Sequence, residues 1–227
     1  MARFIPHEYQ EVAIDWARQK PFCGLFLDMG LGKTVVSLTV IEELLYDFLL
    51  HEKTLVIAPL RVAEDTWSRE VYKWQHTRHL RVSKVLGTAA QRRAALQKDA
   101  DIYVINRENV VWLVETLGDK WDFDLVVIDE LSSFKNHRSK RFRALRKVRP
   151  RIQRVIGLTG TPKPNGYMDL WSQVYLLDRG ERLGKTITQF RNTYFNSSYR
   201  PWGQEYELRP GAEEAINAKI SDICLSM

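Results

Sequence analysis

Five short apolar runs, each followed by a longer segment, constrain the fold of this chain most strongly. The runs are rich in β-branched residues and almost continuously apolar, as parallel strands covered on both faces must be. Their alternation with helical segments predicts an α/β fold with a mostly parallel central sheet and helices on both faces. The runs are CGLFLD (23–28), TLVIAP (54–59), DIYVIN (101–106), DLVVID (124–129) and RVIGLTG (154–160), with RVSKVLG (81–87) as a further candidate.

Helices are expected between these runs, and again after Gly166, where the alternation stops. The earlier helical segments are 34–50, 61–74, 89–97 and 140–148, and the later ones are 166–178, 186–195 and 213–220. The later segments enclose a stretch with Pro and Gly near Pro201 and Pro210. We therefore expect a core over residues 1–165 and a helical C-terminal extension over 166–227 that completes the same unit.

Composition restricts the classes of protein that this chain can be. It has 227 residues, of which 44% are hydrophobic and 27% charged, as in a globular protein. The formal net charge of +6 favours a polyanionic partner. Two distant cysteines, Cys23 and Cys224, argue against a disulfide scaffold or a zinc site. The sequence shows no signal peptide and no apolar run that spans a bilayer, so we expect a cytoplasmic protein of prokaryotic or viral type, neither secreted nor bound to a membrane.

The stretch LFLDMGLGKT (25–34) places a glycine-rich loop between an expected strand and an expected helix. Gly30 and Gly32 allow the backbone to curl so that successive N–H groups point at phosphate oxygens. The helix that begins at Lys33 adds the positive end of its dipole. Lys33 can reach β and γ phosphates, and the Thr34 hydroxyl can ligate Mg²⁺. The stretch therefore predicts a nucleotide-phosphate site.

One departure qualifies the match of this loop to the phosphate-loop pattern. The strict pattern GxxxxGK[ST] has Gly where this chain has Leu27, so the match is to the GxGKT core. A tight strand-to-helix turn with an incidental lysine is the structural alternative. The predicted nucleotide-binding residues of the loop are Met29, Gly30, Leu31, Gly32, Lys33 and Thr34.

A pair of acidic residues follows the apolar strand in LVVIDELSSFKN (125–136). Asp129 at the carboxyl end of a strand suits contact with Mg²⁺. Glu130 is placed to polarise an attacking water, which is the role of a general base. Two ordinary surface acids at a strand end are the alternative. With the phosphate loop, the pair predicts a nucleotide phosphate and Mg²⁺ as ligands.

Motifs in this order resemble those of the SWI/SNF-type branch of superfamily-two helicases, which is related to the DEAH-box proteins. They are HEYQ ending at Gln10, DMGLGKT (28–34), IAPL (57–60), DELSSFKN (129–136) and LTGTPKPN (158–165). The resemblance covers nearly the whole chain and implies the first RecA-like lobe of a P-loop ATPase. It also implies that Gln10 reads the adenine and that Lys33 and Glu130 are catalytic. The Gln10 side-chain amide can pair with the edge of adenine because it carries both a hydrogen-bond donor and an acceptor.

The same resemblance implies contacts with nucleic acid. Pro59, Leu60 and Arg61 match the motif that meets the DNA backbone, and a backbone N–H or an arginine can hold a phosphate there. Residues 159–161 match the motif that couples nucleotide state to grip on nucleic acid; these are Thr159, Gly160 and Thr161. Without the resemblance, their threonines could simply form the turn before Pro162. Leu131 and Ser132 replace the Ala-His of the DEAH box, and Ser132 offers a shorter hydrogen-bonding group.

Motors of this family have two such lobes, and this chain resembles the first alone. We expect the second lobe, in cis or in trans, to bring an arginine finger, and the full motor to couple DNA-dependent ATP hydrolysis to movement along duplex DNA and remodelling of DNA–protein complexes. A non-catalytic, nucleotide-gated DNA-binding module is the alternative. A small-molecule P-loop kinase has less support, because no lid-like arginine cluster follows the loop.

The segment 138–154 contains nine basic residues among seventeen and no acidic one. It could track DNA phosphates. Phe142, Leu145 and Val148, however, recur at spacings that put them on one face of a helix, so the basic residues could equally be a solvated face. The sequence leaves these two interpretations open.

Overall fold

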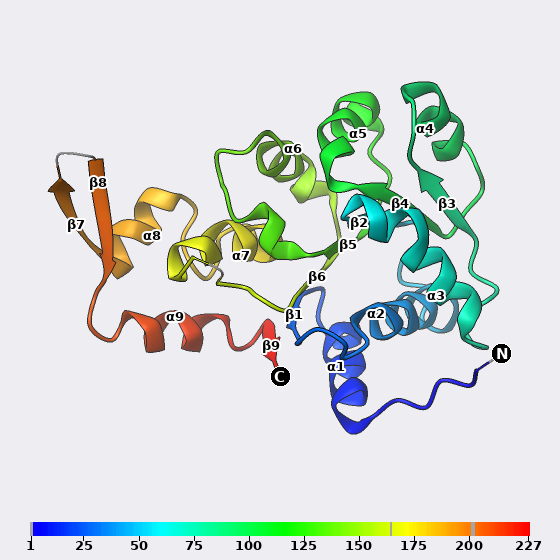
Figure 1. The fold of residues 1–227 in the computed structure, drawn as a ribbon, viewed down its shortest axis with the longest axis horizontal. Coiled ribbons are helices and arrows are strands. Elements are labelled where there is room, and N and C mark those ends of the chain that lie inside the picture. Colours follow the sequence, from blue (N-terminus) through cyan, green and yellow to red (C-terminus); the bar gives the residue numbers. More distant parts are fainter. Residues whose placement is uncertain (1, 164, 201–202) are drawn as a thin grey trace.

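A seven-stranded sheet forms the centre of the computed structural model, which describes residues 2–163, 165–200 and 203–227 (Figure 1). The strand order is β3-β4-β2-β5-β6-β1-β9, and each neighbouring pair is parallel. All six predicted runs form strands. The bounds are β1 Phe22–Phe26, β2 Thr54–Ala58, β3 Val82–Val85, β4 Ile102–Asn106, β5 Leu125–Asp129, β6 Arg154–Thr159 and β9 Cys224–Ser226.

Two hydrophobic cores lie on the two faces of this sheet, because successive side chains of a strand point to opposite faces. On β2, Leu55 and Ile57 join one core, and Val56 and Ala58 join the other. The second core packs under α1 (Glu8–Gln19), α2 (Lys33–Glu42) and α3 (Trp67–Lys73). The first packs under α4 (Ala89–Leu96), α5 (Val110–Leu117), α6 (Lys140–Val148) and α7 (Leu170–Asp178), on the opposite side (Figure 1). Helices on both faces are thus confirmed.

Two expected helices differ in detail from the prediction. The segment 34–50 is α2 followed by a π-helical turn at Glu43–Asp47, and the segment 61–74 begins with a π-helical turn at Val62–Thr66 before α3. Helix α5 was not predicted, because its sequence VVWLVETL is rich in valine, which favours strands. In the part of the chain described, none of the helices has the length and apolar character needed to cross a membrane.

The C-terminal extension is helical, as expected, but it also contains strands that the sequence analysis missed. Its helices are α7, α8 (Ile187–Tyr194) and α9 (Ala212–Ile220). The strands β7 (Phe195–Arg200) and β8 (Gly203–Leu208) form an antiparallel hairpin at the end of the molecule far from the N-terminus (Figure 1). After α9 the chain returns to the central sheet, where β9 pairs with β1. Pro164 and Pro201 lie outside the described residues.

A buried arginine connects the extension to the core. Arg149 is 1% exposed and donates to the carbonyl oxygens of Leu176 at 2.5 Å, of Ile152 at 2.9 Å and of Leu177. Burial lowers its pKa to about 10. Two of the three acceptors belong to the last turn of α7, where a cation also interacts favourably with the helix dipole. Arg149 therefore caps α7 from within the protein.

Candidate functional site

The loop between β1 and α2 has the backbone of a phosphate-binding loop. Gly30 has a φ of 86° and Gly32 a φ of 76°, both in the left-handed region that favours glycine. A Cβ atom on Gly32 would lie 2.6 Å from Nε2 of Gln10. Gly32 is the residue immediately before α2, so the loop delivers the chain into the amino end of that helix. The positive φ therefore favours glycine at this position.

Lys33 lies over the loop that precedes it. Its Nζ donates to the carbonyl oxygens of Leu27 at 2.7 Å and Asp28 at 2.9 Å. Thr34 follows in the first turn of α2, where the backbone N–H groups lack acceptors within the helix. The positive charge and these N–H groups thus meet at one place, which suits a phosphate.

A cavity of about 600 Å³ opens over this loop. Its lining includes the predicted residues Gln10, Gly30, Gly32, Lys33, Thr34 and Asp129. The rest of its lining comes from the N-terminal segment 3–7, Tyr9, Val35, Thr66 and α3. Met29 and Leu31 belong to the loop but are not among the lining residues described, and the Met29 side chain is 85% exposed. The fold therefore gathers most of the predicted nucleotide-binding residues around one space.

Asp129 ends β5 and is held by a tryptophan. The indole Nε1 of Trp67 donates to Oδ2 of Asp129 at 2.9 Å, and Trp67 itself is fully buried. Burial raises the pKa of Asp129, against a smaller lowering by the Trp67 hydrogen bond and by Lys33. The Thr34 hydroxyl and the Asp129 carboxylate are hard oxygen ligands on one cavity, so this donor set fits Mg²⁺.

Trp67 is a site residue that the sequence analysis missed. Its position after the π-helical turn in the segment 61–74 carried no motif, and the indole lies far from Asp129 along the chain. Such π-helical turns are frequent at functional sites, which is the signal that could have drawn attention to it.

Glu130 has an unusual backbone and two hydrogen-bonding neighbours. Its φ is 67°, in the left-handed region, which is a strained conformation for a residue other than glycine. Its Oε1 accepts a hydrogen bond from Oγ1 of Thr159 at 2.8 Å and another from the Ser132 hydroxyl. Thr159 Oγ1 in turn accepts from the N–H of Thr161 at 3.1 Å. Ser132, at the position of the DEAH-box histidine, thus connects to Glu130 directly.

The segment 159–161 also lies against the phosphate loop. Thr159 is buried and pairs with Phe26 at the end of β1. A Cβ atom on Gly160 would lie 3.3 Å from the carbonyl oxygen of Leu27 and 3.7 Å from the N atom of Met29. Gly160 therefore lies close to the backbone of the phosphate loop.

Gln10 bridges α1 and the phosphate loop. It is 6% exposed; its Oε1 accepts from the N–H of His7 at 3.0 Å, and its Nε2 donates to the Leu31 carbonyl oxygen at 3.2 Å. Both ends of the amide therefore have partners in the chain. Recognition of adenine by Gln10 stays a prediction.

Residues 59–61 lie at the same edge of the sheet but apart from the cavity. They follow β2, which is the neighbour of β5 in the sheet. Leu60 is 47% exposed and Arg61 is exposed, and none of the three residues is among those described as lining the cavity. Their contact with DNA stays a prediction.

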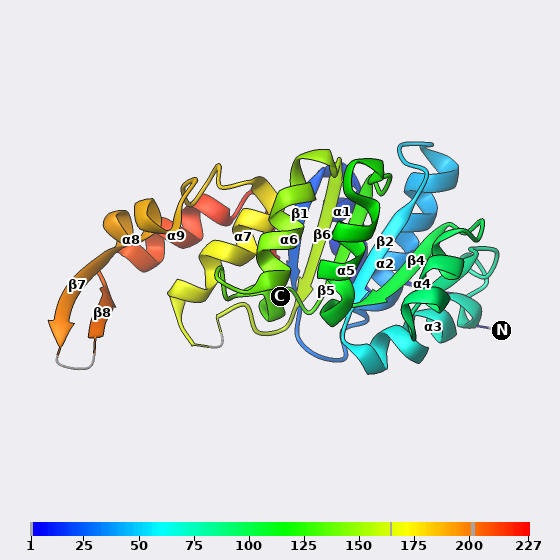
Figure 2. The ribbon, with the colours of Figure 1, turned by 90° about the horizontal axis from the view of Figure 1, so that it is seen from above.

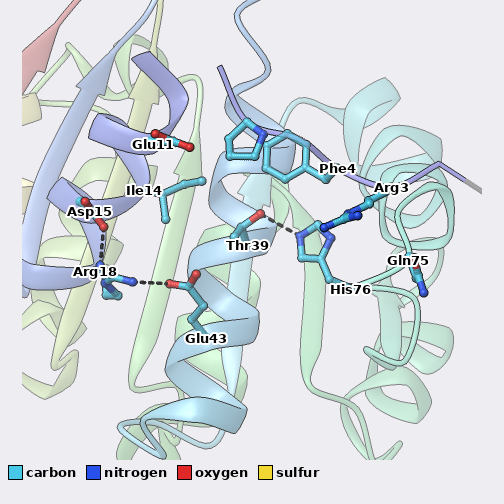
Figure 3. A pocket seen from close by; sticks show the side chains of 11 residues that line it. Arg3, Phe4, Glu11, Ile14, Asp15, Arg18, Thr39, Glu43, Gln75 and His76 are labelled. Carbon is cyan, nitrogen blue, oxygen red and sulfur yellow. Dashed lines mark hydrogen bonds and ion pairs between the residues drawn. The ribbon is translucent and has the colours of Figure 1, made fainter. Parts of the chain in front are cut away.

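A larger cavity of about 710 Å³ lies beside the first, between α1, α2 and the segment that follows α3 (Figure 3). Arg3 and Phe4 line both cavities. In the larger one Arg18 pairs with Asp15 and, at 3.3 Å, with Glu43. Its described lining holds the carboxylates of Glu11, Asp15 and Glu43 and no residue of the phosphate loop, so it is a poor match for a triphosphate.

The basic segment 138–154 is divided between structural and exposed residues. Phe142, Leu145 and Val148 are buried, so the inward face is confirmed. Arg154 donates to the carbonyl oxygens of residues 17, 18 and 20 at the end of α1, at 3.2, 2.6 and 3.0 Å. Arg149 is the cap of α7 described above. The exposed basic residues are Arg138, Lys140, Arg143, Arg146, Lys147 and Arg151.

A parallel sheet with a glycine loop before α2 and an acidic pair after β5 defines a RecA-like P-loop lobe. The SNF2-related domain matches residues 9–208, so the chain belongs to that family. Protein p41 of Acyrthosiphon pisum secondary endosymbiont phage 1 is 39% identical over 235 residues, which cover 100% of this chain and 51% of p41. The human DNA excision repair protein ERCC-6-like is 30% identical over 203 residues, which cover 86% of this chain and 15% of that protein.

The solved structures agree with this family. The Sulfolobus solfataricus SWI2/SNF2 ATPase core in complex with dsDNA superposes with a TM-score of 0.78 and 26% identity, covering 99% of this chain and 45% of that one. The chain thus spans about half the length of p41 and of the archaeal core. The resemblance seen in the sequence and the RecA-like fold are confirmed: the chain is the SNF2-related ATPase lobe of a SWI/SNF helicase-like protein, in a family of ATP hydrolases, and a non-catalytic module is not favoured.

Proposed function

We propose that this lobe binds ATP with Mg²⁺ and, with a second RecA-like lobe, forms a motor that moves along duplex DNA and remodels DNA or DNA–protein complexes. The observation that carries the proposal is the contact network at the carboxyl edge of the sheet. There Thr159 donates a hydrogen bond to Glu130. The neighbouring Asp129 and Lys33 line the same cavity. The archaeal relative whose structure contains dsDNA supports the choice of duplex DNA.

The phosphate loop would hold the nucleotide. Its backbone N–H groups and the amino end of α2 would face the phosphates, and Lys33 would exchange its two carbonyl acceptors for β and γ phosphate oxygens. Thr34 and Asp129 would hold Mg²⁺, which supplies neutralisation of phosphate charge. Gln10, next to the loop, would read the adenine edge.

Glu130 would act as the general base. Both of its hydrogen bonds end on Oε1, so within the described residues Oε2 is the oxygen left to accept a proton from water. Thr159 holds this carboxylate and belongs to the segment that touches the phosphate loop. Movement of residues 159–161 would therefore change both the base and the loop, which is a route for coupling hydrolysis to grip on DNA.

The remaining parts of the proposal concern the wider protein. Residues 1–165 would be the core of the lobe and 166–227 the extension that completes it. Residues 59–61 would contact the DNA backbone at the edge of the sheet. The arginine finger would come from the second lobe, and the phage relative is in line with action inside a prokaryotic cell.

Steady-state ATPase assays of the chain, with saturating duplex DNA, test the proposal. The chain alone should bind Mg²⁺ and ATP in calorimetry but turn over about a thousandfold more slowly than a complete motor, because the finger is missing. Adding the remaining half of p41 should raise turnover. Fast DNA-stimulated turnover by the chain alone would contradict the two-lobe proposal, and binding without turnover in the reconstituted protein would favour the non-catalytic module.

A further inference from the structure

The hairpin and α8 enclose a polar pocket far from the phosphate loop. Its volume is about 290 Å³, which is small for a drug-sized ligand and suited to one phosphodiester group. Thr188, Arg191 and Asn192 of α8 form one wall, and Ser197, Gln204 and Tyr206 of the hairpin form the other. Arg209, which follows the hairpin, also lines the pocket.

The two arginines are held in place by the protein itself. The Arg191 guanidinium lies 4.5 Å from the centre of the Tyr206 ring, and its buried Nε has no hydrogen-bond partner in the part of the chain described. Arg209 donates from Nε to the Phe195 carbonyl oxygen at 3.1 Å. A buried N–H without an acceptor costs free energy, so an acceptor at this point would be favourable.

Charge is segregated across the hairpin. Residues 204, 206 and 208 of β8 share the face that meets α8, while Glu205 and Glu207 point to the opposite face, because alternate residues of a strand do so. The residues described as lining the pocket include Arg191 and Arg209 and no carboxylate. The pocket face is therefore positive and its back is negative.

The position of the pocket favours an extended polyanion that could also reach the carboxyl edge of the central sheet. The hairpin extends toward the same side of the molecule as the loop between β1 and α2 (Figure 2). Tyr199, on the pocket face of β7, is 89% exposed and lies beyond α8 along the hairpin. An arginine flanked by polar side chains binds phosphate oxygens through charge-assisted hydrogen bonds.

We infer that the pocket between α8 and the β7–β8 hairpin binds a backbone phosphate of the duplex DNA, with Arg191 as the principal donor. This inference rests on the proposed function, because it takes duplex DNA as the ligand. It adds a contact on the C-terminal extension to those expected at residues 59–61. The same oxygen chemistry would accept free inorganic phosphate, so the test separates the two sources.

Fluorescence anisotropy of labelled duplex DNA, over a series of salt concentrations, tests the inference with the 227-residue chain. Arg191→Gln should weaken binding by about tenfold at low salt and reduce the slope of log K against log salt by about one, as for one lost phosphate contact. Gln204→Glu, on the exposed hairpin, should weaken binding similarly without removing any core contact. Arg93→Gln, an exposed arginine of α4 at the other end of the sheet, is the matched control and should bind as the parent does.

Parental affinity and salt slope in both pocket variants would overturn the inference. Chemical-shift changes at Arg191 with inorganic phosphate, combined with unchanged DNA affinity in Arg191→Gln, would also overturn it, in favour of a free-anion site. If the parent chain bound no duplex DNA, the DNA part of the proposed function would fail together with the inference. ATP binding, measured in parallel, should be the same in every variant.

Discussion

At the amino edge of the central sheet, polar side chains hold backbone groups, whereas at the carboxyl edge they surround a cavity. Asp124, before β5, accepts from the N–H groups of Glu52 at 3.0 Å and Lys53 at 3.2 Å. Asp101, before β4, accepts from the Arg81 N–H at 2.7 Å. The carboxyl edge instead holds Asp129, a half-buried carboxyl whose pKa is raised by burial, and Glu130, which has a strained backbone.

The contrast shows which edge is built for stability and which for chemistry. Side chains that satisfy backbone groups fix the starts of strands and leave little capacity for a ligand. Strain and a raised carboxyl pKa, in contrast, are tolerated where a ligand uses them. Variants at the carboxyl edge should therefore change function more than stability, and variants at the amino edge should do the reverse.

The largest effect is expected for Glu130→Gln. In a protein reconstituted with a second lobe, turnover should fall by about 10²- to 10⁴-fold, because glutamine cannot accept the proton. ATP affinity, measured by calorimetry, should persist. A parallel loss of binding and turnover would make Glu130 a structural residue. Glu52→Gln, beside the amino edge, is the control and should keep parental turnover.

Lys33→Ala should reduce ATP affinity by about a hundredfold, since charge-assisted bonds to the phosphates are lost. The free energy of unfolding should change little, because the hydrogen bonds described for the Lys33 ammonium are those to the Leu27 and Asp28 carbonyl oxygens of the loop. Calorimetry with ATP and Mg²⁺ checks the first expectation and urea unfolding the second. Lys53→Ala, which removes an ion pair with Asp122 at the other edge, should bind ATP as the parent does. Equal affinity in both variants would refute the assignment of the loop.

At the amino edge, Asp124→Ala should lower the free energy of unfolding by about 2 kcal/mol, because two backbone N–H groups lose their acceptor. Asp122→Ala is a matched control two residues away. Asp122 makes an exposed ion pair, so its loss should cost less than about 1 kcal/mol. Urea unfolding measures both. Weakened ATP binding in Asp124→Ala, without loss of stability, would break the distinction between the edges.

His51, also at the amino edge, should make stability depend on pH. Burial lowers its pKa to about 4 from 6.5, and its Nε2 lies 3.0 Å from Oγ1 of Thr54. Because the unfolded chain takes up the proton first, stability is full above about pH 6.5 and is lost as the pH falls toward 4. We expect the free energy of unfolding to fall by about 1 kcal/mol between pH 7 and pH 5.5. In His51→Gln, the free energy of unfolding should depend less steeply on pH over this range. An unchanged pH dependence would show that other groups cause it.

The smallest effect is expected on α6, away from both edges. If this helix tracks phosphates, changing Arg141, Arg143 and Lys147 to Glu should weaken duplex DNA binding several-fold and flatten its salt dependence. Anisotropy at several salt concentrations measures this. A parental salt slope would show that the helix presents only a solvated face.

The sequence was most informative about features that depend on a single strand or loop. The apolar runs predicted six of the strands, and GLGKT predicted a curled backbone at Gly30 and Gly32, which have positive φ, because each feature depends on neighbouring residues. The acid pair was predicted in the same way from the end of one strand. Strand β9 was missed because it is three residues long and its partner, β1, is distant in the chain. The hairpin was missed because its strands, FNSSYR and GQEYEL, are largely polar and contain no apolar run.

By itself the sequence determined six strands of the central sheet, the phosphate loop and the acidic pair, because strand burial and loop conformation are properties of short segments. The tertiary structure alone decided that Trp67 holds Asp129, that Ser132 and Thr159 hold Glu130, and that Arg149 caps α7. Apart from the local bond between Ser132 and Glu130, these contacts join residues that are distant in the chain. Their distances follow from the order and twist of the strands, which no local pattern of residues encodes.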